Sequence, residues 1–248
     1  MPDRAWFKDW FNSHYYHLLY QHRDDEEALR FIDTLISYLR PSAGAKMVDI
    51  ACGRGRHAKA LADMGFDVTG IDLSAASIGE AKAYEDEHLH FFQHDMRLPF
   101  WINYFDYAFN FFTSFGYFRT DREHNNAIRT IAQGLLPGGV FVIDYLNVHF
   151  EEDRLQGSVT YDDADVHFHI TKWQDEEHFF KQIQVTDAAN TTPRHLYTEK
   201  VAKFSLGDFT EMLAYHSMQV QEVFGDYQLG RYHLRNSPRM IIVARKGE

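Results

Sequence analysis

The sequence has little cysteine and no long apolar segment, and these two absences exclude several kinds of protein. Its 248 residues include a single cysteine, Cys52, so neither an intramolecular disulfide nor a cysteine-rich metal site can form. No apolar run reaches the roughly 18 residues that span a bilayer. The first residues lack the basic start and apolar centre of a secretion signal. The sequence therefore predicts a cytoplasmic protein without a membrane partner.

Positive charge is also scarce. The chain has 25 Lys and Arg against 36 Asp and Glu, a formal net charge of −11, and its basic residues form no run. A protein that follows nucleic-acid phosphates needs a basic face, so we expect no nucleic-acid partner. The 15 histidines include His14-x-x-His17 and His167-x-His169, but neither pair has nearby carboxylates at metal-ligand spacing. We therefore predict no metal site.

Aromatic side chains, by contrast, are abundant, at 16% of the residues. Most are expected in the core, but such a surplus is also typical of proteins whose pockets bind small organic molecules. The aromatic residues are dense near the N-terminus: Trp6, Phe7, Trp10, Phe11, Tyr15, Tyr16 and Tyr20.

The segment from residue 24 to 146 alternates helical and strand-like runs. Residues 24–40 have one apolar helical face, which Pro41 and Gly44 end. Several strand-like runs are apolar on both faces, which suits a parallel sheet covered by helices on each side. The pattern predicts an α/β fold with a doubly wound, Rossmann-like sheet. The expected strands lie at 46–51, 66–74, 89–95, 105–112 and 140–146, the last after a helix that ends before Pro137-Gly138-Gly139.

From about residue 157 to 204 the chain has four strand-like runs, joined by polar turns and without helices. This predicts antiparallel hairpins. A helix capped by Ser205 and two further strands, VQEVFGDY and RMIIVARK, then resume the α/β pattern. We therefore expect a mainly parallel seven-stranded sheet in a domain of residues 1–150 and 205–248. An antiparallel β-subdomain is expected as an insertion at 151–204.

The stretch MVDIACGRGRHAKAL places two glycines between the first strand and the next helix. Such a loop allows a ligand to approach the backbone closely and offers N–H groups at the helix N-terminus. Gly53-Arg54-Gly55-Arg56-His57-Ala58 matches the dinucleotide fingerprint G-x-G-x-x-G/A, and Asp72 lies 19 residues after Gly53, where a ribose-binding acid is expected. The loop alone is thus compatible with a nicotinamide cofactor.

The same loop also resembles motif I of the class I S-adenosylmethionine (SAM)-dependent methyltransferases, (D/E)-x-G-x-G-x-G. Asp49, Gly53 and Gly55 match it, and Ala51 replaces the first glycine, a change expected to be tolerated if the backbone there is not at positive φ. Further family features follow at the strand ends, in the family's order: Asp72 in VTGIDLS, Asp95-Met96 in FFQHDMRLPF, and LLPGGVFVIDYLN. The resemblance covers residues 45–147 well and 205–246 more loosely. It favours SAM over a nicotinamide.

The resemblance implies SAM as the cofactor and assigns roles to individual residues. Asp49 would help to hold the loop and the amino end of SAM, Asp72 would bind the ribose, and Asp95 would accept from the adenine amino group. Cys52 is interpreted as a packed side chain, because displacement at a sulfonium needs no covalent intermediate. The implied cofactor-binding residues are Asp49, Ala51, Cys52, Gly53, Arg54, Asp72, Leu73, Asp95, Met96, Asn110 and Phe111, with Tyr16 and Arg23 from the N-terminal segment.

Two segments and one arginine of the glycine loop have open interpretations. The aromatic N-terminal segment either packs as ordinary helices or, as the small-molecule members of the family suggest, forms a helical lid over SAM. Arg56 either pairs with the carboxylate of the ligand or is a solvated arginine at the helix start. The β-subdomain resembles the insertions that serve such enzymes as a substrate cover or as a contact between two copies in a homodimer.

The implied reaction is methyl transfer to the N or O of a small molecule. A general base is needed only if the acceptor must lose a proton, and Tyr117, Asp144, Tyr145 and His149 are candidates, none of them singled out. Two other functions stay open from the sequence. One is a SAM-binding protein without transferase activity, and the other is an NAD(P)-dependent oxidoreductase.

Overall fold

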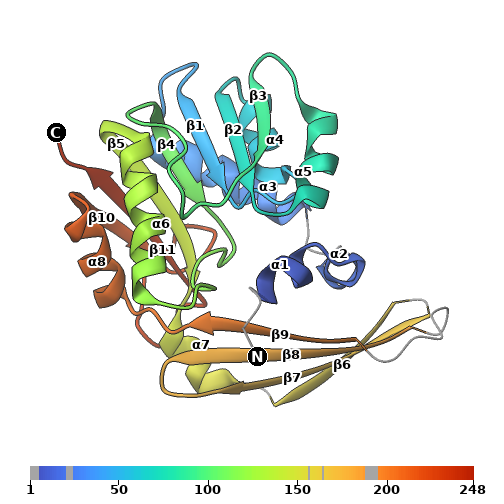
Figure 1. The fold of residues 1–248 in the computed structure, drawn as a ribbon. Helices are drawn as coiled ribbons and strands as arrows, with labels where there is room; N and C mark the ends of the chain where they lie inside the picture. Colours follow the sequence, from blue (N-terminus) through green and yellow to red (C-terminus); the bar gives the residue numbers. More distant parts are fainter. Residues whose placement is uncertain (1–5, 21–24, 156, 164, 188–194) are drawn as a thin grey trace.

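The computed structural model describes the chain apart from residues 1–5, 21–24, 156, 164 and 188–194. Two sheets form, a seven-stranded one in the order β10-β11-β5-β4-β1-β2-β3 and a four-stranded one in the order β6-β7-β8-β9 (Figure 1). The strands are β1 (Lys46–Ile50), β2 (Asp67–Asp72), β3 (Leu89–Gln93), β4 (Phe105–Asn110), β5 (Leu135–Leu146), β6 (Ser158–Asp163), β7 (Val166–Gln174), β8 (His178–Asp187), β9 (His195–Ala202), β10 (Met218–Phe224) and β11 (Arg239–Lys246). The helices are α1 (Trp6–Phe11), α2 (His14–Tyr20), α3 (Asp25–Leu39), α4 (Arg56–Asp63), α5 (Ala75–Ala81), the 3-10 turn η1 (Lys82–Tyr84), α6 (Asp121–Gly134), α7 (Val148–Arg154) and α8 (Leu206–Tyr215).

The large sheet has the predicted doubly wound arrangement. Strands β1 to β5 are parallel, whereas β11 runs antiparallel to β5 and to β10. The chain order reverses between β1 and β4, and in open α/β sheets this is where ligands bind, at the carboxyl ends of the strands. Among the described helices, none is long and apolar enough to cross a membrane.

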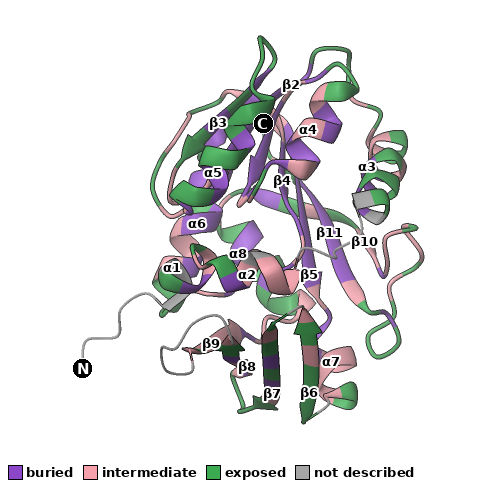
Figure 2. Cartoon of the chain, turned by 90° about the vertical axis from the view of Figure 1, so that its right-hand side faces the viewer, coloured by how far each residue is buried: buried purple, intermediate pink, exposed green. Residues whose placement is uncertain are grey.

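Alternate residues of the central strands enter two separate cores. In β5, Val142 packs in the core with α3, α4 and α5, while its neighbours Phe141 and Ile143 pack in the core with α6 and α8. Successive side chains of a strand point to opposite faces, so a strand covered on both sides must be apolar throughout. Figure 2 shows the result, since the strands of the large sheet are mostly buried and those of the small sheet are mostly not.

The small sheet is an antiparallel meander that packs against the N-terminal helices. Its inner face contributes Phe168, Ile170, Ile183 and Val185 to a third core, which the N-terminal segment completes with Trp10 and other aromatic rings. In Figure 1, α1 and α2 accordingly lie between the small sheet and the large one. The aromatic N-terminus is therefore explained in part by ordinary packing.

Two hydrogen bonds join the end of β9 to the large sheet. The hydroxyl of Tyr145 on β5 donates to the carbonyl of Ala202 at 2.6 Å, and the Ala202 N–H donates to the carbonyl of Gly116 at 2.9 Å. Tyr145 is fully buried, and burial raises its pKa well above the usual value for tyrosine. Tyr145, one of the four general-base candidates, thus uses its hydroxyl to attach the insertion.

The structure differs from the sequence-based boundaries in two places. The sixth α-helix ends at Gly134, and β5 already begins at Leu135, because Leu135 pairs with Phe105 across the sheet and Pro137-Gly138-Gly139 lies within the strand. A short helix, α7, follows β5 and was not expected. The predicted cap at Ser205 is confirmed, and Ser205 and Asp208 form a reciprocal capping box.

The fold generates a prediction about Gly55 at the start of α4. Its φ is 81°, and a Cβ there would lie 2.5 Å from the Phe91 ring, whereas at Gly65, with φ 91°, a Cβ would meet nothing within 4 Å. Gly65→Ala should cost about 1–2 kcal/mol of unfolding free energy from backbone strain alone. Gly55→Ala should cost roughly 1–3 kcal/mol more, because the core around Phe91 is also overpacked. Urea unfolding measures both, and equal costs would contradict the packing assignment.

Candidate functional site

The loop after β1 turns through three residues with left-handed backbone angles. The φ angles are 60° at Ala51, 56° at Gly53 and 81° at Gly55. The condition under which Ala51 was expected to be tolerated is therefore not met, and alanine adopts this conformation at a cost of about 1–2 kcal/mol. Strain of this kind concentrates at ligand sites, where the surrounding structure holds it in place.

A cavity of about 490 Å³ opens at the carboxyl ends of β1, β2 and β4, beside this loop. A second cavity of about 580 Å³ shares part of the same lining and extends below the loop to Asp49. The predicted cofactor residues that line one or both are Tyr16, Asp49, Ala51, Cys52, Gly53, Arg54, Asp72, Leu73, Asp95, Met96 and Phe111. The tertiary structure thus brings together residues that are far apart in the sequence.

Asp72 at the end of β2 links the glycine loop to the next helix. Its Oδ2 accepts from the Gly53 N–H at 2.9 Å, and its Oδ1 accepts from the Ser74 N–H at 2.7 Å. Burial raises the pKa of Asp72, and the three backbone N–H groups that it faces, of Ser74, Gly53 and Leu73, oppose that rise. A carboxylate has about four acceptor positions, so these two bonds leave capacity for hydroxyl groups of a ligand.

Asp49 is a buried carboxyl with an unmet hydrogen-bonding capacity. It is 1% exposed, and its Oδ2 has no hydrogen-bond partner among the described residues. Burial, with the nearby charge of Asp72, raises the pKa of Asp49 to about 7, while a backbone N–H of Ala58 and the charge of Arg56 lower it. An uncompensated carboxylate in such a place is costly, and a cation bound at Oδ2 would remove that cost.

Asp95 and Met96 follow β3, as predicted, and both line the 490 Å³ cavity. Arg97 bridges Asp95 to α6, with its guanidinium 2.7 Å from Asp95 and 2.6 Å from Glu123. The hydrogen bonds to Asp95 raise the pKa of Arg97 above its usual value. The carboxylate of Asp95 is thereby held in one orientation at the edge of the cavity.

Three predicted cofactor residues, Asn110, Cys52 and Arg54, differ from the other described ones in their surroundings. Asn110 is fully buried, and its amide donates to the Ile50 carbonyl at 2.9 Å, so it connects β4 to β1. Cys52 is also buried, and burial raises the pKa of its thiol well above normal, which fits a packed side chain. Arg54 pairs with Glu80 at 2.8 Å, and Arg23 lies outside the described residues.

The segment after β4 is strained and held by a buried ion pair. Phe112 and Thr113 have φ angles of 55° and 58°. Asp144 on β5 accepts from the Phe112 N–H at 2.9 Å, and Arg239 on β11 donates to Asp144 at 2.7 Å and to the Thr113 hydroxyl at 2.9 Å. Asp144 is therefore committed to positioning this loop and is not placed as a general base.

Two other general-base candidates remain, Tyr117 and His149. Tyr117 lines the 490 Å³ cavity, whereas His149 on α7 does not, and its imidazole lies 3.6 Å from the Glu152 carboxylate. Sequence reasoning missed Arg239 and the strained Phe112-Thr113 pair. Two adjacent bulky residues at positive φ leave no mark in composition or periodicity, so no signal could have found them.

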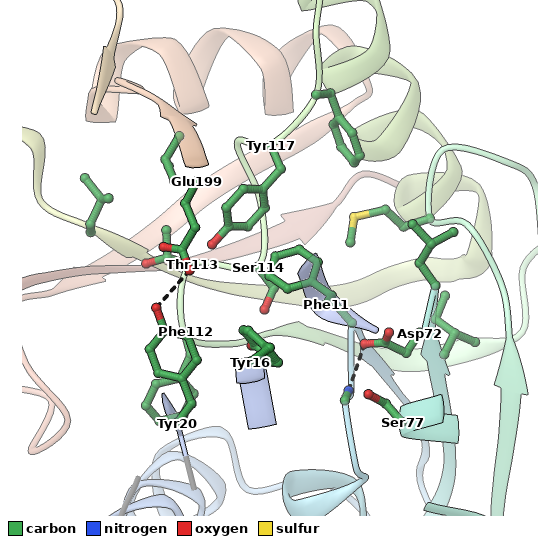
Figure 3. Close-up of a pocket in the computed structure, with 18 of the residues that line it drawn as sticks. Phe11, Tyr16, Tyr20, Asp72, Ser77, Phe112, Thr113, Ser114, Tyr117 and Glu199 are labelled. Carbon is green, nitrogen blue, oxygen red and sulfur yellow. Dashed lines mark hydrogen bonds between the residues drawn. The ribbon is translucent and has the colours of Figure 1, made fainter. Parts of the chain in front are cut away.

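The N-terminal helices and β9 supply one wall of the 490 Å³ cavity. Phe11, Tyr16 and Tyr20 line it from the helices and Glu199 lines it from β9, as Figure 3 shows. Glu199 accepts from the Tyr20 hydroxyl at 2.9 Å and from the indole N–H of Trp10 at 2.7 Å. The lid interpretation is consistent with this placement. Glu199 was missed, because a single acid in an alternating strand reads as a surface residue.

Comparisons with known proteins agree with this geometry. Residues 47–139 match the family model described as a methyltransferase domain. The chain is 33% identical over 132 residues to the dTDP-3-amino-3,4,6-trideoxy-alpha-D-glucopyranose N,N-dimethyltransferase of Streptomyces venezuelae, and the match covers 52% of this chain and 54% of that protein. The chain thus aligns with about half the length of this curated relative.

Solved structures share the fold over nearly the whole chain. An S-adenosylmethionine-dependent methyltransferase from Clostridium acetobutylicum has a TM-score of 0.78 at 17% identity, with 94% of this chain and 96% of that one covered. SAM-bound CalS10, an amino pentose methyltransferase from Micromonospora echinaspora, has a TM-score of 0.69 at 22% identity, with 94% and 97% covered. Residues 47–139 thus match a methyltransferase domain, and nearly the whole chain shares the fold of solved S-adenosylmethionine-dependent methyltransferases.

Proposed function

We propose that this protein binds SAM in the joined cavities and transfers its methyl group to the N or O of a small molecule. The observation that carries the proposal is the buried Oδ2 of Asp49 beside the glycine loop, which has no hydrogen-bond partner in the part of the chain that the structure describes. SAM bears an ammonium and a sulfonium, so it would provide the cation that this carboxylate lacks. A Cβ at Gly53 would meet no atom within 4 Å, so the glycine leaves open space in which a ligand can approach the backbone.

The residues present fit SAM from one end to the other. Asp49 would hold the amino end, and Asp72 would accept from the ribose hydroxyls. Asp95 would accept from the adenine amino group, with Met96 against the ring. Asn110 would support the cofactor site indirectly, because its amide holds β4 against β1. Phe111 and Tyr16 would border the methionine end of SAM.

Bound SAM supplies an electrophilic methyl group that a nucleophile can displace without a covalent protein intermediate. The protein's own part is to orient the two reactants and to exclude water. The loop at Phe112-Thr113, fixed by Asp144 and Arg239, and the aromatic lid lie where both tasks would be performed. Tyr117 is the remaining candidate for removing a proton from the acceptor.

The acceptor is proposed as a small molecule because residues of the insertion and of the N-terminal helices line the cavity beside the glycine loop. The names of the Streptomyces venezuelae relative and of CalS10 refer to amino sugars, which favours nitrogen as the methylated atom here. We also propose the β-subdomain as the cover of the substrate. The cytoplasmic location, the domain boundaries and the pairing of two copies stay predictions from the sequence.

Isothermal titration with SAM, S-adenosylhomocysteine and NAD tests the proposal directly. We expect SAM and S-adenosylhomocysteine to bind and NAD not to bind. The dTDP-linked amino sugar named for the Streptomyces venezuelae relative is a suitable first acceptor in an assay with labelled SAM. Binding of NAD alone would overturn the assignment. Cofactor binding without transfer to any acceptor of a broad metabolite panel would favour a SAM-binding protein without transferase activity.

Asp49→Asn should separate stability from cofactor binding. The folded chain keeps the Asp49 proton up to about pH 7, whereas the unfolded chain loses it near the ordinary pKa of 3.8, so the wild type becomes less stable as pH rises from 4 to 7. The variant lacks this loss, and its unfolding free energy relative to wild type should rise by about 3 kcal/mol between pH 5 and 8. Urea unfolding at both pH values measures it.

The same variant should bind SAM more weakly, by roughly tenfold or more at pH 8, which corresponds to about 1.4 kcal/mol. Wild-type affinity should fall as pH drops below 7, because the carboxylate must then lose its proton on binding, and the affinity of the variant should not. Calorimetry in buffers of different ionisation enthalpy reports the released proton. A pH-independent wild-type affinity would remove Asp49 from the binding site.

Gly53→Ala should weaken SAM binding more than it weakens the fold. The added methyl group would occupy the open space beside the loop, and φ 56° adds backbone strain. Gly65→Ala is the matched control, since it has a similar φ but lies away from the cavities. We expect at least a tenfold loss of SAM affinity for Gly53→Ala and none for the control, by isothermal titration. Equal affinities would mean that the ligand does not approach this glycine.

A further inference from the structure

Glu199 is an acid of the inserted sheet that lines the 490 Å³ cavity. It comes from a different sheet than the strand ends that carry the cofactor motifs. Its side chain is 12% exposed, and it lines the cavity together with Phe11, Tyr16 and Tyr20. The motifs that carry the methyltransferase assignment do not involve it. A carboxylate held this far from solvent needs compensating positive charge or hydrogen bonds.

The described partners of Glu199 supply part of that compensation. The Trp10 indole and the Tyr20 hydroxyl both donate to Oε1. Lys181 on β8 has its Nζ 3.8 Å from Oε2, which is beyond hydrogen-bonding distance, and Lys181 itself donates to the Tyr20 hydroxyl. Lys181 is not part of the cavity lining, so the lysine approaches Glu199 from the side of the sheet.

Two other charged residues of the cavity lining, Arg239 and Asp95, are each bound to an opposite charge in a tight pair. Arg239 donates to Asp144 at 2.7 Å, and Asp95 accepts from Arg97 at 2.7 Å. Glu199 differs because the ion pair that it makes is long and lies outside the cavity. Its carboxylate therefore gives the substrate wall a negative character.

Aromatic rings surround this carboxylate in a connected series. The ring centroids of Tyr117 and Phe11 are 5.4 Å apart, those of Phe11 and Tyr16 are 5.0 Å apart, and those of Tyr16 and Tyr20 are 4.9 Å apart. Figure 3 shows the Tyr117 and Tyr20 hydroxyls near Glu199, with the Tyr20 bond drawn. Aromatic rings beside a carboxylate form an environment that attracts organic cations, through cation–π interaction and charge.

We propose that Glu199 selects the methyl acceptor, which enters the cavity as an alkylammonium held between this carboxylate and the rings of Tyr16, Tyr20 and Tyr117. The inference rests on the proposed function, because it names the substrate class of the same cavity. For methylation the bound ammonium must first give one proton to the Glu199 carboxylate, and the lone pair of the neutral amine then forms the N–CH3 bond while the S–CH3 bond breaks and S-adenosylhomocysteine leaves. Neutral alcohols are discriminated against at binding. Trp10 and Tyr20 position the carboxylate from the lid, so the lid and the inserted sheet together form the acceptor site.

Two probes of matched shape test the charge preference. Choline carries a quaternary ammonium, and 3,3-dimethylbutan-1-ol is its neutral counterpart. With the protein saturated in S-adenosylhomocysteine, and again without it, we expect choline to bind at least tenfold more tightly than the alcohol by isothermal titration. Equal affinity for the two probes, including no measurable affinity for either, would overturn the proposal.

Variants of both members of the ion pair distinguish recognition from a structural clamp. Glu199→Gln retains an oxygen acceptor for Trp10 and Tyr20, and it should abolish the preference for choline. Lys181→Met removes the competing cation and should increase the preference, by a few-fold. Glu176→Gln, at an exposed acid in the turn between β7 and β8, is the matched control and should change nothing. If Glu199→Gln and Lys181→Met both weakened choline binding, Glu199 would be a clamp and the proposal would be wrong.

The cofactor affinities of the same proteins keep this inference separate from the proposed function. We expect S-adenosylhomocysteine to bind wild type, Glu199→Gln and Lys181→Met within about threefold of one another. Loss of S-adenosylhomocysteine binding in the wild type itself would overturn the proposed function. Normal cofactor binding without any preference for choline would overturn only the role of Glu199.

Discussion

The carboxylate of Asp72 is the interaction on which the architecture of the site depends. One of its oxygens receives the Gly53 N–H and the other receives the Ser74 N–H. The hydroxyl of Ser74 in turn caps α5 through the Ser77 N–H and donates to Asn12 in the N-terminal segment at 2.8 Å. One buried acid thus connects the glycine loop, the end of β2, the start of a helix and the lid. The cofactor loop and the lid therefore share one support.

The site is built at a cost to the stability of the chain. Asp49 is buried with an unpartnered oxygen, and Ala51, Phe112 and Thr113 have left-handed backbone angles. Each is unfavourable for the ligand-free fold. Two large apolar cores and the fully satisfied network of Asp144 and Arg239 offset these costs. Strain and buried charge gather at the same strand ends, as expected where binding a ligand would relieve them.

The acceptor side of the cavity has a different origin from the cofactor side. The parallel sheet contributes the loops that carry the family motifs, and these face the proposed position of SAM. The opposite wall comes from the N-terminal helices and β9, which share the third core around Trp10. Such a division allows the acceptor wall to vary while the cofactor loops stay unchanged. Glu199 belongs to this second wall, which is consistent with the proposed role in selecting the acceptor.

The sequence by itself determined the elements that depend on local patterning. Apolar runs, glycine turns and the Ser205 cap predicted the seven-stranded sheet and the inserted hairpins, because period, turn chemistry and capping act over a few residues. The acids at the strand ends could be assigned because parallel strands place their carboxyl ends on one edge. Other features depend on long-range contacts. The early start of β5 required its pairing with Phe105, and the structural role of Tyr145 required Ala202. Only the tertiary structure brought Glu199 to Trp10 and Tyr20 and Arg239 to Asp144, since partners 95 to 189 residues apart leave no local signature.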